Sequence, residues 1–201
     1  EEYDLRIYFI ILGILIFQFF NFSRIKAIFI TLFIVPFIFL SAYQISPIFN
    51  ERVDAGLKDF TSYSQKPWSS LGYRITFATY SWEIIKNNPF LGVGTGDFPQ
   101  EYKKINMAKT PHMNNATNPH NMYILVTTQL GFLGLISFLS IFYFQFKIAF
   151  HSKNVLARDV GFALPIMFLV IMLSDSYLLG HFTTLMFIFF SAFLYKDFES
   201  S

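Results

Sequence analysis

Long apolar segments separated by short polar ones occupy both ends of the chain. A helix crosses a bilayer core of about 30 Å with about 20 apolar residues, because it rises about 1.5 Å per residue. The segments that reach or approach this length are 5–22, 27–43, 121–150, 160–179 and 182–195. Since a helix satisfies its own backbone hydrogen bonds in lipid, we expect an all-α, polytopic membrane helix bundle with about five spans.

The segment between the second and third spans, 44–119, is too polar to lie within a bilayer. Its centre, 70–88, carries apolar residues at the 4-3-4-3 spacing of one helix face: Leu71, Ile75, Ala78, Trp82 and Ile85. This spacing predicts an amphipathic helix that begins at a Ser70 cap. Asp97 followed by Gln100 resembles a capping box and predicts a second, short helix. We expect a helical cap on the membrane surface.

These patterns divide the chain into three parts: two N-terminal spans in 1–43, the loop 44–119, and three C-terminal spans in 120–201. Arg24 and Lys26 lie in the first short loop, and Lys147, Lys153 and Arg158 lie in or beside the loop after the third span. Basic loops face the cytoplasm, so the large loop lies outside and the C-terminus inside. Because the chain begins without Met or a basic leader, we expect it to be the C-terminal portion of a longer protein.

Composition supports a membrane protein and excludes other classes. The chain is 54% apolar and 14% charged, and it contains 28 Phe, whereas soluble domains carry about 25% charged residues. A net charge of +2 is too small to indicate nucleic-acid binding. With no Cys, the chain has neither disulfides nor thiolate metal ligands.

The sequence Asn118-Pro119-His120-Asn121 stands at the outer end of the third span. Asn118 suits an N-cap and Pro119 the first helical position, which would put His120 in the first turn. Free N–H groups and the helix dipole would attract an anion there and keep the imidazole neutral, so that His120 could act as a general base. The alternative is an ordinary histidine at the membrane interface.

Two arginines and one aspartate are candidates for substrate binding. Arg74 lies on the predicted amphipathic helix and Arg52 just past the second span, and a guanidinium can hold a phosphate in bidentate fashion. For both arginines the alternative is contact with lipid head groups or solvent. Asp175 lies near the outer end of the fourth span, where an ionisable residue suggests function but can also be simply hydrated.

No metal site or cofactor is predicted. The sequence contains no Asp-x-Asp, and the glycine-rich segment 92–96 lacks the Lys-Ser/Thr of a phosphate-binding loop. An Mg²⁺-dependent enzyme that uses nucleotide sugars is therefore disfavoured.

The order of these features resembles a known family. It consists of Arg74, Trp82, Pro-Phe-Leu-Gly-Val-Gly at 89–94, His120-Asn121, and Gly-Phe-Leu-Gly at 131–134. This set resembles the O-antigen ligase and O-antigen polymerase superfamily of bacterial inner-membrane proteins, in which a large outer loop lies between two spans. The resemblance covers about 45–150, and the flanking spans match in topology.

The resemblance implies a metal-independent, membrane-embedded glycosyltransferase of lipopolysaccharide biosynthesis with no cofactor. Its donor would be a glycan on undecaprenyl diphosphate and its acceptor a hydroxyl of lipid A-core, at the periplasmic face of the inner membrane. Arg74, with Arg52 second, would bind the donor diphosphate, and His120 would deprotonate the acceptor. Asn121 would orient the acceptor or the His120 ring.

Other functions remain open on the sequence alone. A polysaccharide polymerase and a protein O-oligosaccharyltransferase of the same family use the same donor and similar motifs. A transporter would carry ionisable or broken-helix features at mid-membrane, often in repeated halves, and the first three spans show neither mid-depth charges nor a repeat. A structural membrane subunit would tolerate the loss of His120.

Overall fold

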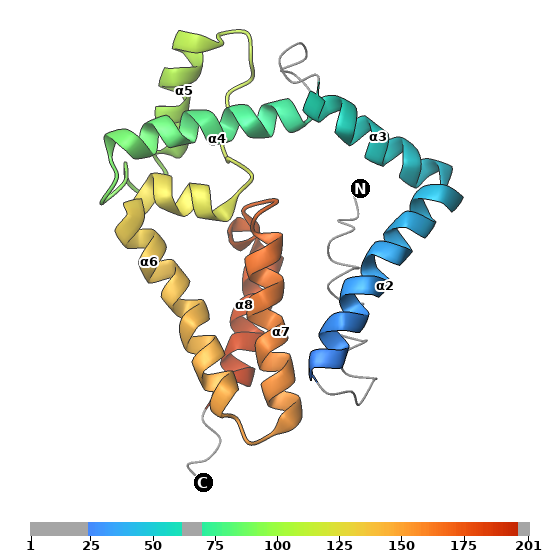
Figure 1. Cartoon of the computed structure of the whole chain (residues 1–201). Coiled ribbons are helices and arrows are strands. Elements are labelled where there is room, and N and C mark those ends of the chain that lie inside the picture. The colour runs from blue at the N-terminus through green and yellow to red at the C-terminus, as the bar shows by residue number, and fades with distance from the viewer. Residues whose placement is uncertain (1–23, 62–69, 197–201) are drawn as a thin grey trace. The chain divides into compact units, whose positions relative to one another are not determined.

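The computed structural model describes residues 24–61 and 70–196, and within these ranges it is helical with no strand. The helices are α2 (Arg24–Ile45), α3 (Pro47–Thr61), α4 (Ser70–Asn87), α5 (Phe98–Lys109), α6 (Met122–His151), α7 (Val155–Ile171) and α8 (His181–Leu194), with a 3₁₀ turn at Tyr177–Leu179 (Figure 1). The predicted all-α class is confirmed. The predicted span 5–22 lies outside the described residues.

The chain divides into two compact units, 1–72 and 73–201. In the first unit, α2 contains the whole of the predicted span 27–43, and the chain turns by 104° between α2 and α3. The Tyr43 hydroxyl donates to Asp54 Oδ1 at 2.8 Å across this bend, and the rings of Phe39 and Phe49 meet edge to face. These contacts hold the two helices together across the bend.

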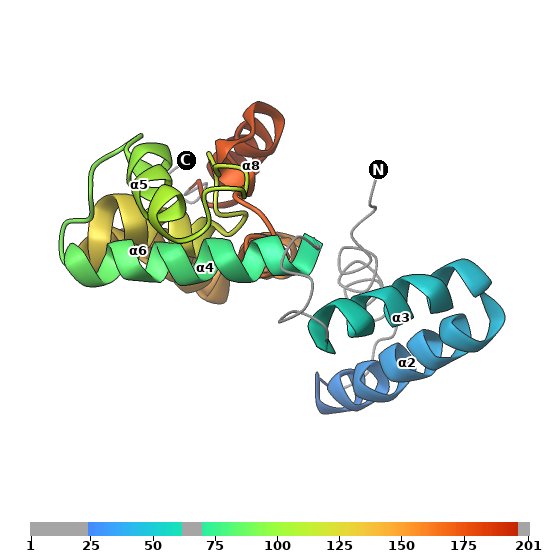
Figure 2. The same cartoon turned by 90° about the horizontal axis from the view of Figure 1, so that it is seen from above.

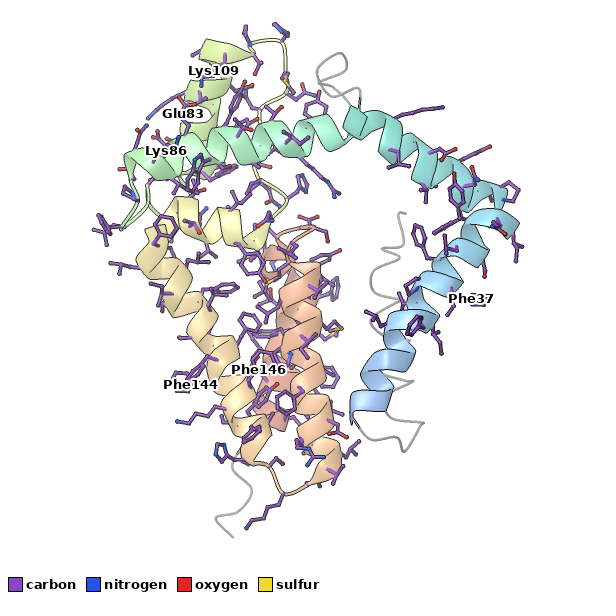
Figure 3. All side chains as sticks on the ribbon, viewed as in Figure 1. Phe37, Glu83, Lys86, Lys109, Phe144 and Phe146 are labelled. Carbon is purple, nitrogen blue, oxygen red and sulfur yellow. The ribbon has the colours of Figure 1, made fainter. Side chains whose placement is uncertain are left out.

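In the second unit, α6, α7 and α8 pack lengthwise against one another, and α4 lies across their end with α5 above it (Figures 1 and 2). Phe146 points from α6 toward α7, where its ring stacks on Phe162, whereas Phe144 points outward (Figure 3). Two hydrogen bonds connect α8 and its end to the other two helices. Gln145 Nε2 of α6 donates to Ser191 Oγ, and the hydroxyl of Tyr195, just after α8, donates to the Gly161 carbonyl of α7.

Helix α6 is broken at Gly131, whose φ of 67° and ψ of −171° are not helical. The glycine-rich loop after α4 supplies hydrogen-bond partners to the backbone groups at this break. Val93 N donates to Thr128 O at 3.0 Å and Gly94 N to Gln129 O at 2.9 Å. In return, the N–H groups of Phe132 and Leu133 donate to the carbonyls of residues 89 and 90. The loop therefore satisfies backbone groups that a straight helix would pair internally.

The described residues contain fewer helices that qualify as membrane spans than the sequence predicts. Among the described residues, only α6 is by itself long and apolar enough to cross a membrane, or two segments qualify if the bent α2–α3 pair counts as one. The predicted span 160–179 forms as α7, which ends at Ile171, followed by a turn. Helix α8 is apolar but has only 14 residues. The five-span topology therefore stays a prediction.

The two helices predicted within the large loop are confirmed, but two local details are wrong. The predicted apolar face of α4 includes Trp82, which is 50% exposed, whereas Thr76, Tyr80, Ser81 and Ile84 are buried. A hydrophobicity pattern does not reveal this buried face, because it includes the polar residues Thr76 and Ser81. Asp97 does stand at the N-cap of α5, but its side chain makes no capping hydrogen bond. Its backbone carbonyl instead accepts from residues 100 and 101.

Candidate functional site

The site is built around the start of α6, which begins three residues later than the predicted cap implies. Asn121, not Asn118, is the N-cap: its Oδ1 accepts from Ile124 N at 3.0 Å. Met122 N donates to the carbonyl of Met172. The predicted placement of His120 in the first turn is therefore wrong, because the better cap lies after it. The N–H groups of Met122 and Ile124, at the start of α6, therefore have hydrogen-bond partners within the protein.

His120 stands just before the helix with a φ of 52°, in the left-handed region. Within the described ranges it is the only residue other than glycine with a positive φ. Such a backbone costs about 1–3 kcal/mol and persists only where the surroundings enforce it. Here Asn118 Oδ1 accepts from His120 N at 3.0 Å, and Asn118 also accepts from the Ser176 hydroxyl.

Asp175 meets the imidazole from the loop between α7 and α8. Its Oδ1 lies 3.1 Å from His120 Nδ1, and both side chains are nearly half exposed, at 45% for His120 and 43% for Asp175. The same Oδ1 accepts from Ser176 N at 2.7 Å, which orients the carboxylate. A carboxylate at Nδ1 favours the tautomer that is protonated there and leaves Nε2 with its lone pair.

The histidine and aspartate loops are joined on both sides of this pair. Asn121 Nδ2 donates to the carbonyl of Leu173 at 3.1 Å, and Asn118 Nδ2 lies 3.4 Å from Asp175 Oδ1. The structure thus brings together two predicted site residues that are 55 positions apart in the chain. It also gives Asn121 a structural task, since this side chain both caps α6 and holds the neighbouring loop.

Phe77 of α4 covers the imidazole. Its ring stacks on His120 with a centroid distance of 5.9 Å and an interplanar angle of 26°. Phe77 in turn contacts Tyr102, a fully buried residue of α5, at 5.7 Å. Burial raises the pKa of the Tyr102 hydroxyl, so this support stays neutral. No local sequence pattern marks Phe77 as a site residue.

Arg74 lies three residues before Phe77 on α4, and it is exposed. Residues three apart are neighbours on a helix surface, with Cβ atoms about 5–6 Å apart. Tyr73 also contacts Phe77, at a centroid distance of 5.9 Å. Arg74 therefore stands within one helical turn of the ring that covers His120. Arg52 lies on α3 in the first unit, and its role stays a prediction.

Metal ligands do not gather at this site. In 24–61 and 70–196 no group of three or more His, Asp or Glu side chains is placed to hold a metal ion. The pair His120–Asp175 alone offers one nitrogen and one carboxylate, which is fewer than the ligand sets of known catalytic zinc sites.

A family model described as O-Antigen ligase matches residues 6–139, more than half of the chain. The chain belongs to the O-antigen ligase family. This confirms the resemblance drawn from the motifs, and the matched range includes Arg52, Arg74, His120 and Asn121. It ends before Asp175, which the structure alone connects to the others. A comparison with curated proteins found no match.

Proposed function

We propose that this O-antigen ligase family member transfers a glycan from undecaprenyl diphosphate to an acceptor hydroxyl of lipid A-core, at the periplasmic face of the inner membrane. The observation that carries the proposal is the half-exposed His120–Asp175 pair, which has the geometry of an oriented general base. Phe77 covers one side of the imidazole, so an acceptor approaches the remaining open part of the ring.

The reaction is a single displacement at the anomeric carbon. His120 Nε2 takes the proton of the acceptor hydroxyl as the acceptor oxygen bonds to the anomeric carbon. The bond between that carbon and the diphosphate oxygen breaks, and its electron pair leaves with the lipid diphosphate. Asp175 accepts a hydrogen bond from Nδ1 and stabilises the imidazolium that forms.

Arg74 is the residue we assign to the donor diphosphate. Its guanidinium keeps its charge in apolar surroundings and forms two parallel hydrogen bonds to phosphate oxygens. It lies on α4 one turn from the ring that covers His120, so the leaving group and the base are served by adjacent elements. The positive charge of this guanidinium offsets the negative charge that grows on the diphosphate as the glycosidic bond breaks.

The first experiment measures glycan transfer by the full-length protein with His120→Asn or Arg74→Ala. Asn accepts the left-handed backbone and can still hydrogen-bond to Asp175, but it cannot take up a proton. We expect His120→Asn to lower the transfer rate at least about 10²-fold without lowering thermal stability. Loss of a charge-assisted phosphate contact in Arg74→Ala should lower the rate about 10- to 100-fold.

Lys103→Ala is the matched control, since Lys103 is an exposed cation on α5 and not on the α4 face toward His120. It should transfer glycan at the normal rate. Normal transfer by His120→Asn would overturn the role of His120. Equal losses in Arg74→Ala and Lys103→Ala would show a general effect of charge rather than a diphosphate contact.

The acceptor is tested in a strain that lacks the gene. Loss of all glycan-capped lipopolysaccharide supports transfer to lipid A-core. Retention of a single repeat unit would instead assign the protein as a polymerase, and unmodified target proteins would assign it as a protein O-oligosaccharyltransferase. Normal surface glycan of every kind would contradict glycosyl transfer and leave a transporter or structural subunit.

A further inference from the structure

We infer that residues 89–91, the tip of the loop after α4, insert into the outer leaflet of the bilayer and that the membrane boundary passes through the break in α6. Phe90 and Leu91 carry the inference, since their exposed fractions are 70% and 75%. The inference concerns a lipid-contact surface and holds whether or not the proposed transfer reaction is correct.

The backbone around Phe90 and Leu91 is held in place, so these side chains cannot turn inward without breaking the loop. The N–H groups of residues 132 and 133 donate to the carbonyls of Pro89 and Phe90. On the other side, Gly92 N donates to Asn88 O and Val93 N to Thr128 O. A loop fixed at both ends presents its two apolar side chains permanently to its surroundings.

The loop tip adjoins the apolar surface of α6. The hydrogen bond from Leu133 N to Phe90 O puts the tip directly beside the first turn after the break. Leu133 and Ile136 in that part of the helix are 56% and 65% exposed, and Phe132 is 40% exposed. The exposed apolar surface of α6 therefore continues onto the loop.

The length of α6 after the break indicates that lipid covers this apolar surface. The segment 132–151 has about 20 residues and spans about 30 Å, the thickness of a hydrocarbon core. The preceding segment, 122–130, runs beneath α4 in a different direction (Figure 1). One boundary at Gly131 thus puts the apolar segment in the bilayer and the His120–Asp175 pair on the outer side, at the level of lipid head groups.

The 201 residues contain no Cys, so an introduced cysteine is the only thiol among them, and any cysteine elsewhere in the full-length protein would be replaced by Ser. We would label Phe90→Cys and Leu91→Cys with a nitroxide in the full-length protein, reconstituted in vesicles of phosphatidylethanolamine and phosphatidylglycerol. Collision with oxygen, which enters lipid, is compared with collision with a water-soluble nickel chelate. Thr95→Cys, exposed in the same loop, is the control for water, and Ile136→Cys is the control for lipid.

We expect labels at 90 and 91 to collide several-fold more often with oxygen than with the nickel chelate, as at 136, and the label at 95 to show the reverse. Circular dichroism matching the unmodified protein shows that the labelled chains are folded. Nickel accessibility at 90 and 91 equal to that at 95 would overturn the inference. Low collision with both reagents would also overturn it, because protein and not lipid would then cover the loop.

Discussion

His120 combines an unfavourable backbone conformation with a side chain that its neighbours hold in one orientation. Its left-handed φ of 52° is held by a hydrogen bond to Asn118, and its ring is held between Asp175 and Phe77. Strain of this kind concentrates at sites where function demands one geometry. The side chains of Asn118, Asp175 and Phe77, from three different segments, thus fix the position of one imidazole.

Asp175→Asn tests whether the carboxylate acts through the imidazole. Asn keeps an oxygen for the Ser176 N–H but has no charge to stabilise an imidazolium. It can also donate to Nδ1, which would put the proton on Nε2 and remove the base. We expect the transfer rate to fall about 10²- to 10⁴-fold with little change in acceptor KM.

The control for Asp175→Asn is Asp159→Asn. Asp159 pairs with its neighbour Arg158 at the opposite end of α7 and has no contact with the site. Asp175→Glu should recover part of the rate, because it restores the charge. A raised KM with an unchanged kcat in Asp175→Asn would instead mean that Asp175 binds substrate directly.

At the scale of elements, the loop 88–94 and the break in α6 form one unit. An ideal Cβ at Gly92 would lie 2.3 Å from the carbonyl carbon of Gln129, and one at Gly131 would lie 2.1 Å from Phe90 O. Both glycines also have positive φ angles. Here glycine is needed because two backbones approach too closely for any side chain.

Gly92→Ala and Gly131→Ala should therefore each destabilise the second unit. Each adds a backbone collision to the cost of a positive φ, and we expect about 3 kcal/mol or more, measured by thermal unfolding in detergent. Gly96→Ala is the matched control. Its φ is also positive, at 87°, but an added Cβ meets nothing within 4 Å, so only about 1–2 kcal/mol should be lost. Equal losses at all three positions would contradict the collision.

At the scale of the whole molecule, α7 passes close to α6 and α8 at a small residue. An ideal Cβ at Gly161 would lie 3.0 Å from the Ala149 Cβ and 3.5 Å from Tyr195 Cε1. The Tyr195 hydroxyl donates to the carbonyl of the same glycine. Small residues at such crossings let helices in membranes pack closely without a hydrophobic driving force.

Gly161→Val should lower the unfolding temperature of the bundle, since its branched side chain forces α6 and α7 apart at an expected cost of about 1–3 kcal/mol. The matched control is Gly56→Val on α3, where an added Cβ meets nothing within 4 Å. Thermal unfolding in one detergent compares the two. An unchanged unfolding temperature in Gly161→Val would show that the crossing is not tightly packed.

Much of the fold follows from local sequence. The apolar runs predict α2 and α6, and the 4-3-4-3 spacing predicts α4, because a helix side chain meets residues three and four positions away. The order of motifs also identified the family before any geometry was known. Arg74 and His120 were predicted as site residues in this way, although His120 was assigned to the wrong position relative to its helix.

The sequence by itself determined the helical class and the family, and it predicted His120, Arg74 and Asp175 as site residues. Only the tertiary structure decided that Asp175 meets His120, that Phe77 covers it, and that the glycine-rich loop closes the break in α6. The physical reason is range. Helix periodicity and caps act over a few residues, whereas the meeting of 120 with 175 depends on how whole helices pack. The contact of 92 with 129 joins backbone to backbone, so no side-chain pattern specifies it.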